Sequence, residues 1–234
     1  MIYTMPTFQN PTGISTSQAH REQLLSLSEK HRIPIFEDGF EEEMKYCGRV
    51  VLPIKSMDRN QLVIYCGTFS KVLFPGVRIG WIAAARECID RLAAIQCFSE
   101  LSPSMILQAA IQEFCQKGCY DRQISKMHRV FRKRMQTALR ALHRHISPAW
   151  AEWTEPSGGF LIWLKLQPVS GPPPDWKSLL AAHGVEAAAG SNFFFGGTSD
   201  TYLRLSISAL NEEEIDEGIR RLAAALRQVY AEQS

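Results

Sequence analysis

The sequence predicts an α/β protein with a mainly parallel, buried sheet, and three observations support this prediction. Short apolar runs at residues 33–36, 62–66 and 79–84 have the length and the branched side chains of buried strands. Longer segments with apolar residues at helical spacing lie among and after these runs. Turn residues such as Pro75-Gly76 separate the segments. This alternation is typical of strands joined by helices into a parallel sheet.

The first half of the chain supplies the strands of that sheet. Residues 1–4 form a short apolar run that suits the end of a buried strand, and residues 15–32 predict a helix that starts on polar residues. The run 33–36 leads into the acidic pair Glu37-Asp38, and the run 62–66 leads into residues 67–71, Gly-Thr-Phe-Ser-Lys. Polar groups therefore follow the predicted strands directly.

The second half of the chain is richer in helices. Long helical patterns cover residues 103–117 and 120–145, and a shorter one covers 176–183. Residues 160–166 and 202–208 predict strands. The last helix is expected to run from Asn211 to about residue 232, because Asn is a good N-cap residue and Glu214 stands three positions later.

Composition and charge exclude several classes of protein. Hydrophobic residues make up 45% and charged residues 21% of the chain, as in ordinary globular proteins. The formal net charge is only +2, so bulk charge indicates no partner. No apolar run reaches the roughly 18 residues that a membrane-spanning helix needs, so no membrane partner is expected.

The six cysteines predict neither a metal site nor a disulfide framework. They are scattered between residues 47 and 119, and no His or Cys near Cys115 and Cys119 completes a zinc-binding set. The N-terminus also lacks the basic and apolar regions of a secretory signal. We therefore expect free thiols, no metal and a reducing, cytoplasmic location.

Four motifs carry the chemistry of the chain. They are Asn10-Pro11-Thr12-Gly13, Glu37-Asp38-Gly39-Phe40, residues 67–71, and residues 75–81 (Pro-Gly-Val-Arg-Ile-Gly-Trp). The first three come just after predicted strands. Open α/β sheets bind ligands beyond the carboxyl ends of their strands, so the motifs are expected to meet at one crevice.

Taken together, these motifs resemble the class I/II aminotransferases, which are fold-type I enzymes dependent on pyridoxal 5'-phosphate (PLP). The resemblance extends from Asn10 to the segment around Arg204, and Ser-Lys-x-x-x-Pro-Gly-x-Arg-x-Gly is its most specific part. It implies a PLP-dependent transferase-like fold, with residues 1–135 as the C-terminal portion of a PLP-binding large domain. Residues 136–234 would form a small α+β domain.

The resemblance also implies a role for each residue of the site. Lys71 would form a Schiff base with the cofactor aldehyde and move a proton at the substrate Cα, which only a deprotonated amine can do. Asp38 would keep the pyridine nitrogen protonated, and Asn10 would hydrogen-bond the 3-oxygen. The other implied residues bind phosphate or carboxylate: Thr68, Ser70 and Arg78 near the cofactor phosphate, and Arg204 at the substrate α-carboxylate.

The sequence departs from the family pattern in two respects. Phe40 occupies a cofactor position where the family usually has a tyrosine, so one hydrogen bond of about 1 kcal/mol would be missing. The family also has an N-terminal half, with a phosphate loop and an aromatic residue that stacks on the ring. Without it the sheet would expose unpaired edges. We therefore expect a fragment, a truncated product or a unit that needs a partner.

The activity implied is transfer of an amino group between an amino acid and a 2-oxo acid, and family members are usually homodimers. An alternative is the PLP-binding effector domain of a GntR/MocR-type transcriptional regulator, which residues 67–76 resemble equally well. The reaction and the homodimer are both expectations that follow from the resemblance.

A third interpretation is direct nucleic-acid binding by the basic segment 121–147. Its arginines and lysines are spread around the predicted helix instead of lying on one face. Apolar residues recur at spacings of three and four, which predicts a packed face. We therefore expect no direct contact with nucleic acid, and the apolar residues concerned are Met127, Val130, Phe131, Met135, Ala138, Leu139 and Leu142.

Overall fold

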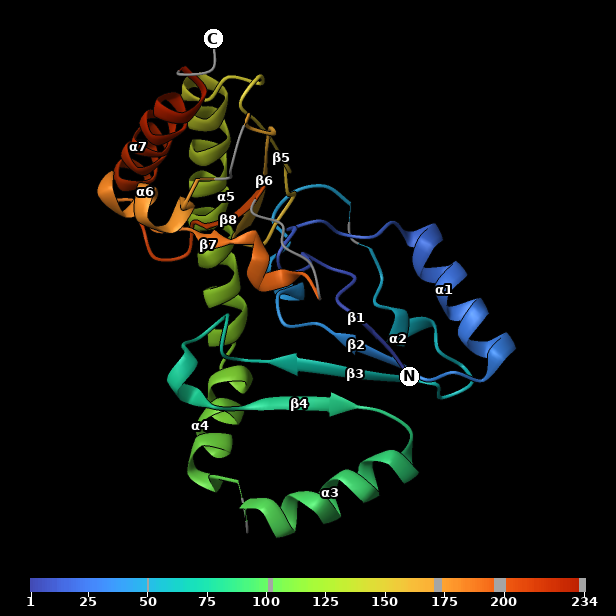
Figure 1. Cartoon of the computed structure of the whole chain (residues 1–234). Helices are drawn as coiled ribbons and strands as arrows, with labels where there is room; N and C mark the ends of the chain where they lie inside the picture. Colours follow the sequence, from blue (N-terminus) through green and yellow to red (C-terminus); the bar gives the residue numbers. More distant parts are fainter. Residues whose placement is uncertain (50, 101–102, 171–173, 196–200, 232–234) are drawn as a thin grey trace. The chain divides into compact units, whose positions relative to one another are not determined.

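The computed structural model divides the chain into two compact units (Figure 1). Unit 1 comprises Met1–Thr7 and Ser15–His128, and unit 2 comprises Phe8–Ile14 and Arg129–Ser234. The structure describes residues 1–49, 51–100, 103–170, 174–195 and 201–231. Each unit combines helices with a four-stranded sheet, which confirms the predicted α/β class.

The sheet of unit 1 contains three parallel strands and one antiparallel strand. Its order is β1 (Ile2–Thr4), β2 (Ile35–Asp38), β3 (Val63–Thr68) and β4 (Gly80–Ala83). β4 runs antiparallel to β3, and Gly80 at its start pairs with Thr68 at the end of β3. The residues before β4 therefore lie at the same edge as the residues after β3.

The helices of unit 1 are α1 (Gln18–His31), α2 (Ile54–Met57), α3 (Arg86–Glu100), α4 (Met105–Gln116) and the beginning of α5 (Cys119–His145). Two 3-10 turns cover Glu42–Met44 and Pro75–Val77. Leu25 of α1 and Ile54 of α2 pack with Ile35 and Val63 of the sheet. α1 and α2 therefore cover the face of the sheet that carries these two residues, leaving Phe36 and Asp38 on the other face.

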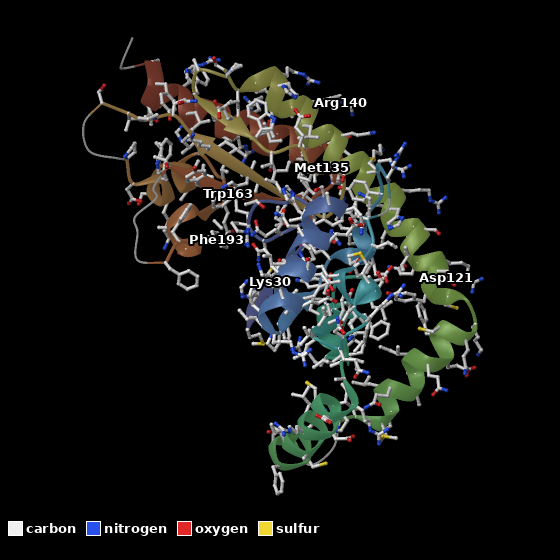
Figure 2. The ribbon with its side chains drawn as sticks, turned by 90° about the vertical axis from the view of Figure 1, so that its right-hand side faces the viewer. Lys30, Asp121, Met135, Arg140, Trp163 and Phe193 are labelled. Atoms are coloured by element: carbon white, nitrogen blue, oxygen red, sulfur yellow. The ribbon has the colours of Figure 1, made fainter. Side chains whose placement is uncertain are left out.

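Unit 2 contains an antiparallel sheet and three helical segments. The sheet order is β5 (Ala151–Trp153), β6 (Leu161–Leu166), β8 (Tyr202–Ser206) and β7 (Ala188–Ala189). The last part of α5, α6 (Trp176–Ala182) and α7 (Glu212–Ala231) supply the helices, and a 3-10 turn covers Gly190–Phe193. Trp163 of β6 and Phe193, both labelled in Figure 2, pack edge to face with centroids 5.6 Å apart.

Two helices behave as the sequence predicts. The Asn211 N–H donates to Glu214 Oε2 (2.8 Å) and the Glu214 N–H donates to Asn211 Oδ1 (3.0 Å), so a reciprocal cap starts α7. The apolar stripe of α5 is also confirmed, since it buries Phe131, Met135, Ala138, Ala141 and Leu142. The basic residues of α5 are thus the solvated part of a packed helix.

The described residues offer neither a membrane-spanning helix nor a cluster of metal ligands. No helix among them is long and apolar enough to cross a membrane. They also contain no group of three or more His, Cys, Asp or Glu side chains that could hold a metal ion.

Two glycines of unit 2 are expected to respond in opposite ways to alanine. Gly13 has a φ of +68°, and a Cβ there would lie 2.5 Å from the Leu161 carbonyl oxygen, so Gly13→Ala should lower the free energy of unfolding by about 2 kcal/mol. Gly218 lies within α7, and a Cβ there would meet no atom within 4 Å. Gly218→Ala should therefore raise the free energy of unfolding by up to about 1 kcal/mol.

Chemical denaturation of the two variants checks this pair of predictions. Equal changes in both variants would show that the backbone at Gly13 is not under the steric constraint described.

Candidate active site

The predicted cofactor residues of unit 1 gather at one edge of its sheet. Asp38 is the last residue of β2 and Thr68 is the last residue of β3. Ser70 and Lys71 follow β3 directly, and Arg78 precedes the antiparallel β4, whose start pairs with Thr68. Parallel strands end at the same edge, so the direction of the strands brings these side chains together.

The carboxylate of Asp38 is held through both of its oxygens. The Tyr3 hydroxyl of β1 donates to Oδ2 at 2.7 Å, and the Phe40 backbone N–H donates to Oδ1 at 3.2 Å. A carboxylate has about four acceptor positions, so the two donors leave room for a further one. Phe40 thus contributes its backbone to the site, where the sequence offers no side-chain hydroxyl.

Hydrogen bonds of the backbone and of the Thr68 side chain order the loop after β3. Thr68 Oγ1 accepts from the Ser70 N–H (3.1 Å), and the Phe69 N–H donates to the Ile79 carbonyl (3.1 Å). The Leu73 N–H donates back to the Phe69 carbonyl at 2.8 Å. These bonds curl the chain around Lys71, whose side chain is exposed.

Arg78 stands in an unusual backbone conformation at the end of the 3-10 turn. Its φ is +50°, in the left-handed region that few residues other than glycine adopt. One guanidinium nitrogen donates to the Pro75 carbonyl at 3.3 Å, and the side chain is otherwise exposed. A guanidinium has five N–H donors, so most of this group remains able to bind an oxyanion.

In unit 2 the structure brings together Asn10 and Arg204, which are 194 residues apart. Arg204 lies on β8 and its Nη1 donates to Asn10 Oδ1 at 2.7 Å. Its Cζ lies 4.8 Å from the centroid of the Phe193 ring. Arg204 Nε is buried and has no hydrogen-bond partner among the described residues, which fits a site for an anionic ligand.

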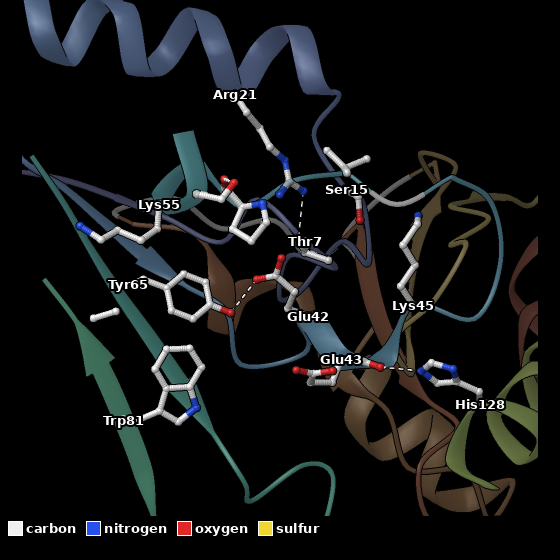
Figure 3. A pocket seen from close by; sticks show the side chains of 14 residues that line it. Thr7, Ser15, Arg21, Glu42, Glu43, Lys45, Lys55, Tyr65, Trp81 and His128 are labelled. Carbon is white, nitrogen blue, oxygen red and sulfur yellow. Dashed lines mark hydrogen bonds between the residues drawn. The ribbon is translucent and has the colours of Figure 1, made fainter. Parts of the chain in front are cut away.

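A cavity of about 540 Å³ lies elsewhere in unit 1 (Figure 3). Figure 3 shows Tyr65 and Trp81 on one side of it, and the Tyr65 hydroxyl donates to Glu42 at 2.6 Å. The cavity is also lined by Arg21 and Lys55, and none of the predicted cofactor residues lines it. We place the candidate site at the strand ends instead, because the convergent charged and hydroxyl groups are there.

Sequence reasoning missed Tyr3 as a residue of the site. It lies 35 residues before Asp38, and only the parallel register, in which Tyr3 pairs with Phe36, places the two on one face of the sheet. The alternation of side chains along a strand could have indicated the shared face, but the sequence contains no signal for the register.

The comparisons with known proteins agree with this geometry. The family model "Aminotransferase class I and II" matches residues 4–222. Aromatic-amino-acid aminotransferase 1 of Thermococcus litoralis is 36% identical over 97% of this chain and 54% of its own length. An uncharacterized HTH-type transcriptional regulator of Bacillus subtilis is 33% identical over 98% of the chain and 47% of its own length.

Solved structures of aminotransferases are also similar to this chain. The multiple substrate aminotransferase of Thermococcus profundus has a TM-score of 0.92 and 34% identity, with 98% of this chain and 57% of that chain covered. The α-aminoadipate aminotransferase of Thermus thermophilus, solved with N-(5'-phosphopyridoxyl)-L-leucine, has a TM-score of 0.90 and 30% identity, with coverage of 98% and 59%. The chain thus spans about half the length of the curated relatives it matches.

Proposed function

Because the chain belongs to the class I and II aminotransferase family, we propose that it binds PLP and transfers an amino group between an amino acid and a 2-oxo acid. PLP is the cofactor of this family. The observation that carries the proposal is the convergence of Asp38, Thr68, Lys71 and Arg78 at one edge of the unit 1 sheet. Each residue type suits one part of the cofactor.

Each cofactor residue of unit 1 has a different role toward PLP. Lys71 supplies the amine for covalent attachment and moves the proton at the substrate Cα. Asp38, with acceptor capacity beyond its two present donors, keeps a proton on the pyridine nitrogen. Arg78 holds the phosphate through its guanidinium, and the hydroxyls of Thr68 and Ser70 assist it. When bound, PLP supplies an electron sink for bond breaking at the substrate Cα.

The other two predicted residues, Asn10 and Arg204, lie in unit 2. Arg204 receives the substrate α-carboxylate, for which its buried Nε–H is a ready donor. Asn10 uses its Oδ1 for Arg204, which leaves the Nδ2 hydrogens to bind the 3-oxygen of the cofactor. Since Phe40 has no hydroxyl, Asn10 would be the main side-chain donor to that oxygen.

A second candidate function is that of a PLP-binding effector domain in a transcriptional regulator. The observation in its favour is the regulator of Bacillus subtilis, which matches nearly the whole chain at 33% identity. The residues needed to bind PLP and an amino acid are the same in both cases. The two candidates differ only in whether the bound amino acid reacts to completion.

Three further proposals concern organisation. We propose that residues 1–135 and 136–234 act as large-domain portion and small domain, that the chain works in the cytoplasm, and that it self-associates. Apolar side chains on α3 and α4 support self-association, since Phe98 is 91% and Ile106 82% exposed. Large apolar side chains that are this exposed favour a role in an interaction surface.

Addition of PLP to the purified chain tests the main proposal. We expect a visible absorbance band from cofactor bound covalently to lysine. Amino acids are then added. Release of a 2-oxo acid identifies an aminotransferase, and a spectral change without release identifies an effector domain. A chain that gives no band with PLP would contradict both functions.

A further inference from the structure

Tyr3 makes a contact for which the function proposed above provides no explanation. Its hydroxyl donates to Asp38 Oδ2 at 2.7 Å, although neither residue is near the other in the sequence. The register of β1 and β2 pairs Tyr3 with Phe36, and Asp38 lies two residues further along β2 on the same face. The long tyrosine side chain thus reaches the last residue of the neighbouring strand.

The ring of Tyr3 is fixed by a second contact. It stacks on Phe36 with centroids 5.9 Å apart and an angle of 20° between the planes. This stacking restrains the ring although 56% of the Tyr3 surface is exposed. The hydroxyl is therefore held in place beside Asp38.

The Tyr3 hydroxyl also stays protonated over the neutral pH range. Partial burial raises the pKa of Tyr3 well above its ordinary value, and the hydrogen bond to Asp38 and its negative charge raise it further. Tyr3 is thus a hydrogen-bond donor at every pH at which the chain is expected to work.

Asp38 is consequently held from two sides. The Phe40 N–H on its own loop holds Oδ1, and Tyr3 on the neighbouring strand holds Oδ2. A backbone donor alone would leave Oδ2 able to turn about the Cβ–Cγ bond. With both donors, the plane of the carboxylate is determined, while acceptor positions remain open for a ring N–H.

We propose that Tyr3 is a positioning residue that orients the Asp38 carboxylate toward the pyridine nitrogen of PLP. This inference rests on the proposed function, because it takes Asp38 as the partner of that nitrogen. Tyr3 touches Asp38 and acts through it.

Tyr65 provides a matched control. Its hydroxyl also donates to a carboxylate, Glu42, at 2.6 Å, and it lies on β3 in the same sheet. Tyr65 lies on the opposite face from Asp38, because it alternates with Cys66, which pairs with Asp38. Tyr65→Phe thus also removes a hydrogen bond from a tyrosine hydroxyl to a carboxylate, but on the face of the sheet that does not carry Asp38.

The experiment compares Tyr3→Phe, Tyr65→Phe and the parent chain during titration with PLP. Tyr3→Phe keeps the stacked ring and loses only the hydroxyl. Loss of one hydrogen bond to a charged group predicts PLP binding that is weaker by about three- to tenfold. The pH midpoint of the absorbance band should also move upward, because a less protonated ring draws fewer electrons from the nitrogen that links it to Lys71.

Tyr65→Phe should change neither the PLP affinity nor the pH midpoint. In an Asp38→Asn background, Tyr3→Phe should add little, since the two residues act as one unit. A Tyr3→Phe chain with the parent's affinity and midpoint would overturn the inference, as would equal shifts in both tyrosine variants. A parent chain that gives no band overturns the proposed function itself, so the two failures are distinguishable.

Discussion

Replacing Lys71 with alanine is expected to abolish the visible band that PLP gives with the chain. Covalent attachment needs a primary amine, and Lys71 is the lysine that follows β3 at the edge where Asp38 and Thr68 end their strands. Amino-group transfer should fall by at least about a thousandfold, because the same amine also carries the proton at the substrate Cα. Absorbance titration and single-turnover assays measure the two effects.

The control for this prediction is Lys30→Ala. Lys30 is an exposed lysine near the end of α1 and is not one of the predicted cofactor residues. Its removal changes the charge equally but should leave the band and the activity as they are. A band of equal strength in the Lys71→Ala chain would show that another lysine holds the cofactor.

Replacing Arg204 with glutamine is expected to weaken binding of amino acids by about a hundredfold, since two charge-assisted hydrogen bonds to a carboxylate are lost. Arg204 has a buried Nε with no partner among the described residues, and its Nη1 is oriented by Asn10. The amino-acid concentration that gives half of the spectral change of the PLP-loaded chain measures the effect. Arg204→Lys should be intermediate, because it keeps the charge but loses the planar fork.

Arg134→Gln is the matched control for Arg204. Arg134 also lies in unit 2 with its Cζ 5.4 Å from a phenylalanine centroid, that of Phe131, and it donates to the Ser208 carbonyl at 2.7 Å. It is not among the predicted site residues, so its replacement should leave amino-acid affinity unchanged. Equal losses in the two variants would assign the effect of Arg204 to the structure of unit 2 as a whole.

Helix ends were predictable because the interactions that form them are local. Ser17 accepts from the His20 N–H at the start of α1, and Asn211 and Glu214 cap α7 reciprocally. α3 was not predicted, although Ile89, Leu92, Ile95 and Phe98 recur in it at a spacing of three residues. None of its described side chains is buried.

The strands were harder to predict in direction than in position. The runs that became β1, β2 and β3 were recognised from their apolar residues, but the antiparallel course of β4 was not predicted. An apolar run has the same composition in either direction. β5 and β7 were not predicted, because β5 is interrupted by Glu152 and β7 is only two alanines, so neither forms an apolar run like the one that marks β1.

The sequence by itself determined which chemical groups stand at the end of which strand: Asp38 ends β2, Thr68 ends β3 with Lys71 soon after it, and Arg78 precedes β4. Tertiary structure decided which of them have partners. It joined Tyr3 to Asp38, and it placed Phe8–Ile14 in unit 2, where Asn10 meets Arg204. Motifs and caps depend on neighbours within a few residues, whereas these contacts depend on register and packing between distant segments, which no local pattern specifies.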